Sequence, residues 1–281
     1  MDEYIPLGVR QGAINPEVLH EGVPSWLSQS LKEWLEGALM VQDYRTGSMT
    51  LDAEKLRAIE RVCRLNLDWQ KDKFSARSHL QRMADREEYH DIFLWAIDYL
   101  CAKGSPYASR DELEQILKEG GSAWRVSTMG VPHLERRVPE AVSEAAEQVM
   151  AHSGEAGKLL ADAWRELYGI SPDPSEAYRH AVRAIEAAAH ESVIPDDPKA
   201  TLGTMIKAMR DKPEKWVVTT EGTHPVETII DMMETVWTSH TDRHGEKGGV
   251  KDLVDGAADL AVQLAVALVG LFVGGAVQRS A

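Results

Sequence analysis

The chain has 281 residues, 43% of them hydrophobic and 27% charged, which is ordinary for a globular protein of about two domains. Its 31 basic and 45 acidic residues give a net charge of −14, which excludes broad affinity for nucleic acid over the whole surface. The two cysteines, Cys63 and Cys101, form no CxxC pattern, so we expect neither a disulfide framework nor a zinc ribbon. This cysteine usage favours the cytoplasm, and the acidic N-terminal segment lacks the apolar run of a secretory signal.

Helical patterns dominate the N-terminal part of the chain. Apolar spacing predicts a helix capped by Ser25, a run over residues 51–67, a helix over 86–102 and a further helix capped by Ser109. Residues 55–86 hold nine basic and four acidic side chains. Three of the arginines are spaced to share one helical face, namely Arg57, Arg61 and Arg64. Such a stripe is most often a solvated face, and a nucleic-acid-binding surface is the alternative.

A small β-hairpin is expected next. The short runs SAWRVS and HLERRV are partly alternating, contain β-branched residues and are joined by a Gly-Val-Pro turn, and we expect this hairpin to be the only sheet. Helices are predicted after Pro139 and over residues 155–168. The segment GISPDPS at residues 169–175 then predicts a domain boundary at about residue 170.

Residues 171–281 are predicted to form an up-and-down bundle of helices. Ser175 is the expected N-cap of the first helix, and further helices are expected over 201–209 and 226–239, with a loop over 212–225. The last helix lies within residues 260–277, eighteen residues with one polar side chain, Gln263. That length is at the lower limit for a membrane span. Three glycines and the sparse flanking charge favour a buried helix and no membrane. The predicted fold class is therefore mainly α, with an N-terminal domain (residues 1–170) of unknown role.

The densest polar cluster is the sequence HTDRHG, which we term the His240–Gly245 turn, at the end of an apolar helix. His240 and His244 can donate or accept a proton near neutral pH, and Arg243 can stabilise charge that develops on a phosphate. Asp242 can orient one of the imidazoles. These are the parts of a metal-independent ribonuclease site, in which a ribose 2′-hydroxyl attacks the neighbouring phosphate.

Two other interpretations of this turn remain open. Cationic side chains and glycine are favoured at helix C-termini, so the turn can be a simple cap. His240 and His244 are also spaced to bind a metal, but Arg243 opposes a cation and no HExxH pattern is present. Ser122 and Ser127 lack a G-x-S-x-G context, and no dinucleotide or P-loop motif occurs, so no cofactor is predicted.

The segment from Ser175 to Val277 resembles the C-terminal domain of bacterial abortive-infection proteins, a branch of the HEPN superfamily of helical bundles. The resemblance covers about a third of the chain and is carried by SEAYRHAVRAIEAAAHESV, by Thr201-Leu202-Gly203, by Arg243-His244-Gly245 and by the Ala/Leu/Val-rich last helix. It implies a homodimer that cleaves RNA in phage defence.

The family's usual arginine, which stands a few residues before the histidine, is replaced here by Ser239, with His240 beside it. The resemblance thus implies either that His244, Arg243 and His240 carry the chemistry, or that the domain is a non-catalytic interaction module sensing a phage or host protein. Glu186 matches a frequent acidic position of the family. It either faces His244 or is a solvent-exposed helix residue.

Overall fold

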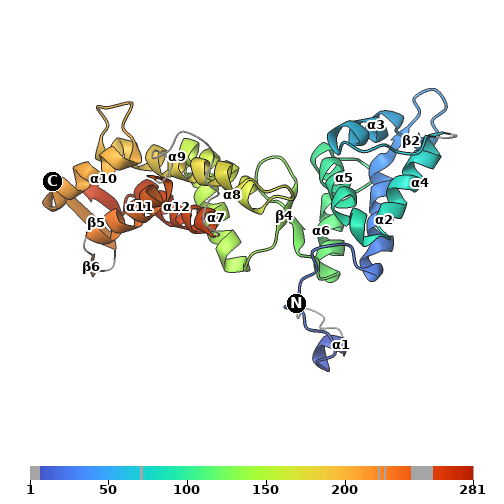
Figure 1. The fold of residues 1–281 in the computed structure, drawn as a ribbon, viewed down its shortest axis with the longest axis horizontal. Coiled ribbons are helices and arrows are strands. Elements are labelled where there is room, and N and C mark those ends of the chain that lie inside the picture. Colours follow the sequence, from blue (N-terminus) through green and yellow to red (C-terminus); the bar gives the residue numbers. More distant parts are fainter. Residues whose placement is uncertain (1–6, 70–71, 221, 225, 242–255, 281) are drawn as a thin grey trace. The chain divides into compact units, whose positions relative to one another are not determined.

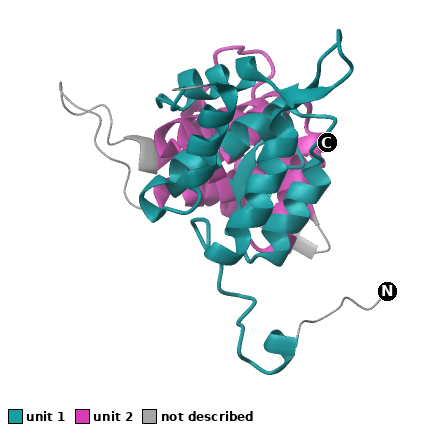
Figure 2. Cartoon of the chain, turned by 90° about the vertical axis from the view of Figure 1, so that its right-hand side faces the viewer, with its two compact units in different colours: residues 1–137 teal, residues 138–281 magenta. Residues whose placement is uncertain are grey.

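The computed structural model describes residues 7–69, 72–220, 222–224, 226–241 and 256–280 (Figure 1). Internal contacts divide the chain into two compact units, Met1–Arg137 and Val138–Ala281 (Figure 2). Both units are mainly helical and carry small antiparallel strand pairs. The mainly α fold class expected from the sequence is confirmed.

Unit 1 has a helical core. Its elements are α1 (Leu7–Arg10), α2 (Ser25–Leu39), β1 (Met40–Gln42), β2 (Met49–Leu51), α3 (Ala53–Val62), α4 (Lys73–Met83), α5 (His90–Lys103), α6 (Arg110–Glu119), β3 (Trp124–Val126) and β4 (Leu134–Arg136). Helix α2 packs against α5 and α6, and α3 and α4 cover the same core. The fully buried side chains that fill it include Leu31, Leu35, Leu56, Leu80, Phe93, Ile97 and Leu113.

Side-chain caps set several helix starts in unit 1. Ser109 accepts a hydrogen bond from the backbone N–H of Asp111, which confirms it as the N-cap of α6. Asp52 and Asp72 cap α3 and α4 in the same way. The N-cap position of α2 is Pro24, without a side-chain cap, and the predicted cap Ser25 is instead the first helical residue.

The β3–β4 hairpin forms as predicted, with Trp124 opposite Arg136. The expectation that it is the only sheet is wrong. Strands β1 and β2 form a second hairpin, and β5 (Trp216–Thr220), β6 (Gly222–His224) and β7 (Val277–Arg279) form a three-stranded sheet in unit 2. Most of these strands are three residues long, too short for an alternating pattern to stand out in the sequence.

Unit 2 is built around one central helix. Its helices are α7 (Glu140–His152), α8 (Gly154–Tyr168), α9 (Pro174–Val193), α10 (Leu202–Asp211), α11 (Val226–Thr241) and α12 (Ala257–Val273). Helix α9 packs most extensively against α8 and α12. Small buried residues on α9 permit this close approach: Ala177, Ala181, Ala184 and Ala189.

The boundary between the units lies earlier than the predicted one at residue 170, because α7 and α8 pack against α9 and α12. Residues 169–175 form a tight connection between two packed helices, in which the Asp173 N–H donates to the carbonyl of Glu166 at 2.7 Å. Asp173, rather than the expected Ser175, caps α9 by accepting from the backbone N–H groups of residues 175 and 176.

Helix α12 is shorter than the apolar run that predicts it. It ends at Val273, and Gly275 takes a left-handed conformation with φ +71° that leads the chain into β7. Its buried face includes Ala261, Ala265, Leu268 and Phe272. Within the described residues, no helix combines the length and apolar character needed to cross a membrane.

Candidate functional site

The predicted catalytic turn follows α11. His240 belongs to the last turn of this helix, and its side chain lies outside what the structure describes. Asp242, Arg243 and His244 also lie outside the described residues. What the structure does describe is how the bundle holds the helix that leads into this turn, together with the fifth predicted residue, Glu186.

Two contacts hold the C-terminal half of α11. The buried Tyr178 of α9 donates its hydroxyl to the backbone carbonyl of Val236. The next residue, Trp237, lies against Gly203 in the first turn of α10, where a Cβ would stand 2.8 Å from Trp237 Cζ2. Because one helical turn is 3.6 residues, His240 follows Trp237 by about one turn of backbone. The start of α10 and the last turns of α11 therefore lie together.

This arrangement explains the Thr201-Leu202-Gly203 sequence physically. Thr201 and Thr204 form a capping box, in which each side chain accepts a hydrogen bond from the other residue's backbone N–H. Gly203 leaves room for the Trp237 ring. Thr201 thus caps the start of α10, and Gly203 allows α10 to pack against α11.

Glu186 is not the solvent-exposed helix residue of one expectation, and His244, its expected partner in the other, lies outside the described residues. Its Oε1 accepts a hydrogen bond from the backbone N–H of Leu202 at 2.8 Å, and its side chain is partly buried. Burial raises the pKa of this carboxyl, while the Leu202 N–H and nearby Arg183 act in the opposite direction. Glu186 therefore joins α9 to the start of α10, at the point where α10 meets α11.

The predicted arginine stripe of unit 1 is only partly correct. Arg57 and Arg61 are exposed on α3, but the helix ends at Val62, and Arg64 lies beyond it in a left-handed conformation with φ +52°. A single helical face therefore does not carry all three arginines. Among the described residues none of the three forms an ion pair.

Arg57 and Arg61 instead line a depression of about 580 Å³ together with Glu60 and Trp69, which we name the Arg57–Trp69 pocket. The guanidinium carbon of Arg57 lies 5.5 Å from the centre of the Trp69 ring. Glu60 Oε1 accepts from the backbone N–H of Leu67 at 2.8 Å. Glu60 and Trp69 were not predicted as site residues from the sequence. A tryptophan inside a run of basic residues was the available signal.

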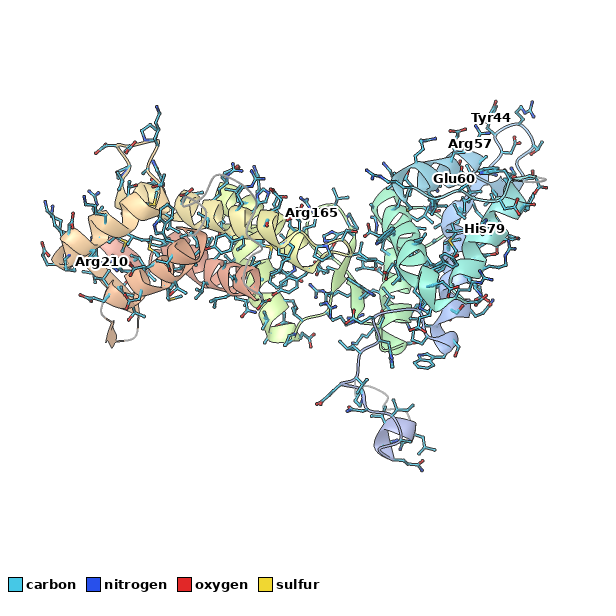
Figure 3. The ribbon with its side chains drawn as sticks, viewed as in Figure 1. Tyr44, Arg57, Glu60, His79, Arg165 and Arg210 are labelled. Carbon is cyan, nitrogen blue, oxygen red and sulfur yellow. The ribbon has the colours of Figure 1, made fainter. Side chains whose placement is uncertain are left out.

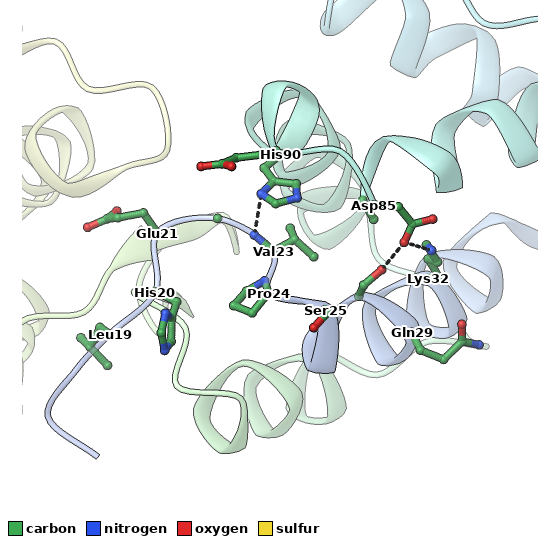
Figure 4. A pocket seen from close by; sticks show the side chains of 14 residues that line it. Leu19, His20, Glu21, Val23, Pro24, Ser25, Gln29, Lys32, Asp85 and His90 are labelled. Atoms are coloured by element: carbon green, nitrogen blue, oxygen red, sulfur yellow. Dashed lines mark hydrogen bonds and ion pairs between the residues drawn. The ribbon is translucent and has the colours of Figure 1, made fainter. Parts of the chain in front are cut away.

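A second depression in unit 1, of about 750 Å³, has charged walls that are already engaged (Figure 4). Lys32 pairs with Asp85, which also accepts from Ser28 Oγ at 2.9 Å. These hydrogen bonds lower the pKa of Asp85. His90 Nδ1 accepts the backbone N–H of Val23 at 3.1 Å. The polar groups of this depression hold the segment before α2 in place.

The β3–β4 hairpin contains a buried serine and a partly buried histidine whose geometry is structural. Ser127 Oγ lies 2.9 Å from His133 Nδ1 and accepts the backbone N–H of His133 at 3.0 Å. In a serine hydrolase the hydroxyl faces Nε2 of the histidine, but here His133 Nε2 lies 3.7 Å from Glu135 Oε2. Ser127 is 7% exposed, and we assign this cluster to holding the hairpin together.

Within the described ranges, no group of three or more His, Cys, Asp or Glu side chains is placed to hold a metal ion. Cys63 and Cys101 are free and buried, and burial raises the pKa of each thiol to about 11. Both thiols are therefore protonated near neutral pH.

Comparison with protein-family models, with curated proteins and with solved structures finds no match to this chain.

Proposed function

We propose that the chain is a metal-independent endoribonuclease of the abortive-infection type, with an HEPN-like bundle in unit 2 and its catalytic groups on the His240–Gly245 turn. His244 acts as general acid and base, Arg243 stabilises charge on the phosphate, His240 assists and Asp242 orients an imidazole. The ribose 2′-oxygen bonds to phosphorus as its proton leaves to a base, and the 5′-oxygen departs with a proton from an acid. The products are a 2′,3′-cyclic phosphate and a 5′-hydroxyl.

One observation carries this proposal: a polar junction of three helices stands directly before the turn. Tyr178 holds the backbone of α11 at Val236, and the close contact of Gly203 with Trp237 seats the start of α10 one helical turn before His240. Glu186, a partly buried carboxylate with a raised pKa, closes the same junction from α9. Fixed helix ends of this kind suit general acid–base chemistry, which needs its groups held in position.

The resemblance to abortive-infection proteins further leads us to propose that the chain acts as a homodimer in phage defence, in response to a phage or host protein. The carboxylates of unit 2 do not favour long-range attraction of RNA, since residues 138–281 hold 23 acidic and 13 basic side chains. RNA contact outside the turn is therefore expected from unit 1.

The test is cleavage of labelled single-stranded RNA in excess EDTA by the wild-type chain and by His244→Ala. Loss of a general acid–base group should reduce the rate by about 100-fold or more, with an unchanged melting temperature. His152→Ala is a matched control. His152 also lies at a helix C-terminus, where Nδ1 is 2.7 Å from the carbonyl of Gln148, and this variant should cleave normally.

Equal cleavage by wild-type and His244→Ala protein would overturn the assignment. Absence of cleavage by the wild-type chain in every RNA tested would overturn it in favour of a non-catalytic interaction module. A large drop in the melting temperature of His244→Ala would assign His244 to helix capping instead.

A further inference from the structure

We propose that the Arg57–Trp69 pocket of unit 1 binds one unpaired nucleotide of single-stranded RNA, stacking its base on Trp69 and reading an amino group of that base with Glu60. The choice of RNA over DNA rests on the proposed function, whereas the nucleotide chemistry of the pocket stands on its own contacts.

Unpaired positive charge is the first observation. Some arginines of unit 1 are neutralised by carboxylates, as in the pairs Arg77–Glu36, Arg136–Glu21 and Arg137–Glu114. Arg57, Arg61 and Arg64 are exposed and have no carboxylate partner among the described residues. Exposed arginines without internal partners are available to phosphate oxygens, which they can bind with two parallel hydrogen bonds.

An aromatic surface lies beside these cations. Trp69 is partly exposed and lines the pocket, and the guanidinium of Arg57 stands over its ring at 5.5 Å. Unpaired bases stack on aromatic rings and on arginine planes, and this stacking tolerates every base. Arg57 is an exposed side chain of α3 and can move with an entering base (Figure 3). A pocket of about 580 Å³ has room for a single nucleotide.

Glu60 gives the pocket a means of selecting the base. Its Oε1 is engaged by the backbone N–H of Leu67, so this carboxylate is held in a fixed position on the wall of the pocket. Its Oε2 has no hydrogen bond among the described contacts. A carboxylate only accepts hydrogen bonds, so Oε2 suits the exocyclic amino group of adenine, cytosine or guanine. Uracil has only carbonyl oxygens outside its ring and lacks this donor.

The test measures the fluorescence anisotropy of labelled oligo(A), oligo(C) and oligo(U) RNA with the full-length His244→Ala chain in EDTA. We expect oligo(A) and oligo(C) to bind more tightly than oligo(U). Trp69→Ala should weaken binding of oligo(A) by about 5- to 100-fold, the range for loss of one base–aromatic stack, and Trp69→Phe should restore most of it. Arg86→Ala is the matched control, because Arg86 is also exposed and lies 5.9 Å from the ring of Tyr89. It should retain wild-type affinity.

The Glu60→Gln variant tests the base preference most directly. Glutamine keeps a carbonyl oxygen for the Leu67 N–H and presents an NH₂ donor where Oε2 stood, so the preference should shift from oligo(C) toward oligo(U). An unchanged preference would overturn the role of Glu60. Equal binding by Trp69→Ala and the parent chain, or equal loss in Arg86→Ala, would overturn the pocket. Tighter binding of oligo(dA) than of oligo(A) would overturn the choice of RNA.

The two proposals can fail separately. Cleavage by the wild-type chain with unchanged binding by Trp69→Ala would refute the pocket and leave the catalytic turn in place. Pocket-dependent binding without any cleavage would refute the nuclease and leave the pocket in place.

Discussion

The two candidate sites use polar side chains in opposite ways. At the junction before the catalytic turn, Glu186 and Tyr178 are directed to backbone groups of α10 and α11, so they build the fold. At the Arg57–Trp69 pocket, Arg57 and Arg61 have no carboxylate partner among the described residues and face solvent. A group already satisfied by the backbone stabilises the protein, whereas an exposed and unpaired one is available to a ligand.

Two arginines of unit 2 contrast with Arg57 and Arg61, because each is paired with a carboxylate. Arg165 lies 3.2 Å from Asp162, and Arg210 makes two hydrogen bonds to Glu234 (Figure 3). These pairs offset part of the positive charge of unit 2. Substitutions at the junction should therefore change stability, and substitutions at the pocket should change RNA binding.

The largest effect on stability is expected for Gly203→Ala. The new Cβ would stand 2.8 Å from the Trp237 ring, and overpacking of this kind costs about 1–3 kcal/mol. Urea denaturation measures the loss. Gly270→Ala on α12 is the control, because its Cβ would stand 3.2 Å from a single methyl of Val149 and alanine favours a helix. Equal stability of both variants would break the proposed contact between α10 and α11.

A smaller effect is expected at Glu186. Glu186→Ala removes the acceptor of the Leu202 N–H and should destabilise the protein by about 1 kcal/mol. Burial raises the folded-state pKa of this carboxyl, so its charged form is disfavoured in the fold, and that cost appears only as the pH rises through the carboxyl range. Glu186→Gln, which keeps an acceptor without a charge, should thus gain stability relative to wild type toward neutral pH.

The Glu186→Gln gain should fade on acidification toward about pH 4, where protonation removes the charge from the wild-type carboxyl. Denaturation at several pH values checks the trend, with Glu191→Gln on the exposed face of α9 as the control. A gain that is independent of pH would contradict the assigned burial of Glu186.

The smallest effect on stability is expected for a substitution in the pocket, and it separates a binding role from a structural one. Arg61→Ala should leave the free energy of unfolding within about 0.5 kcal/mol of wild type, as for other surface substitutions. The same variant should lower the slope of log affinity for single-stranded RNA against log salt by about 0.7, the value for one lost phosphate contact. An unchanged slope would show that Arg61 does not meet a phosphate.

Helices that have a capping residue, a terminal glycine or a clear apolar spacing could be predicted from the sequence. Ser109 and the left-handed Gly104 bound α6 and α5 as expected, and the apolar spacing of α8 and α11 is visible in the sequence. Helix α4 was missed because polar residues dominate KFSARSHLQRM and only Ala76, Leu80 and Met83 are buried. The helix predicted over residues 51–67 extends past the end of α3 because nothing in the sequence marks the left-handed turn at Arg64.

Tertiary partners were harder to predict than the elements themselves. The Pro-rich segment at 169–175 has the same composition whether it separates two domains or connects two packed helices, and only the packing of α8 on α9 decides between them. Glu60 and Trp69 lie nine residues apart, and they line one pocket because the chain turns back after α3. Such proximity is not encoded in helical periodicity.

The most direct measurement of the central claim is the chemistry of the RNA ends produced in EDTA. Mass spectrometry of fragments from a single-stranded oligonucleotide should find 2′,3′-cyclic phosphates and 5′-hydroxyls, and the fully 2′-O-methylated oligonucleotide should remain intact. Cleavage of the methylated strand, or fragments with 5′-phosphates, would contradict attack by the ribose 2′-oxygen and with it the role assigned to the His240–Gly245 turn.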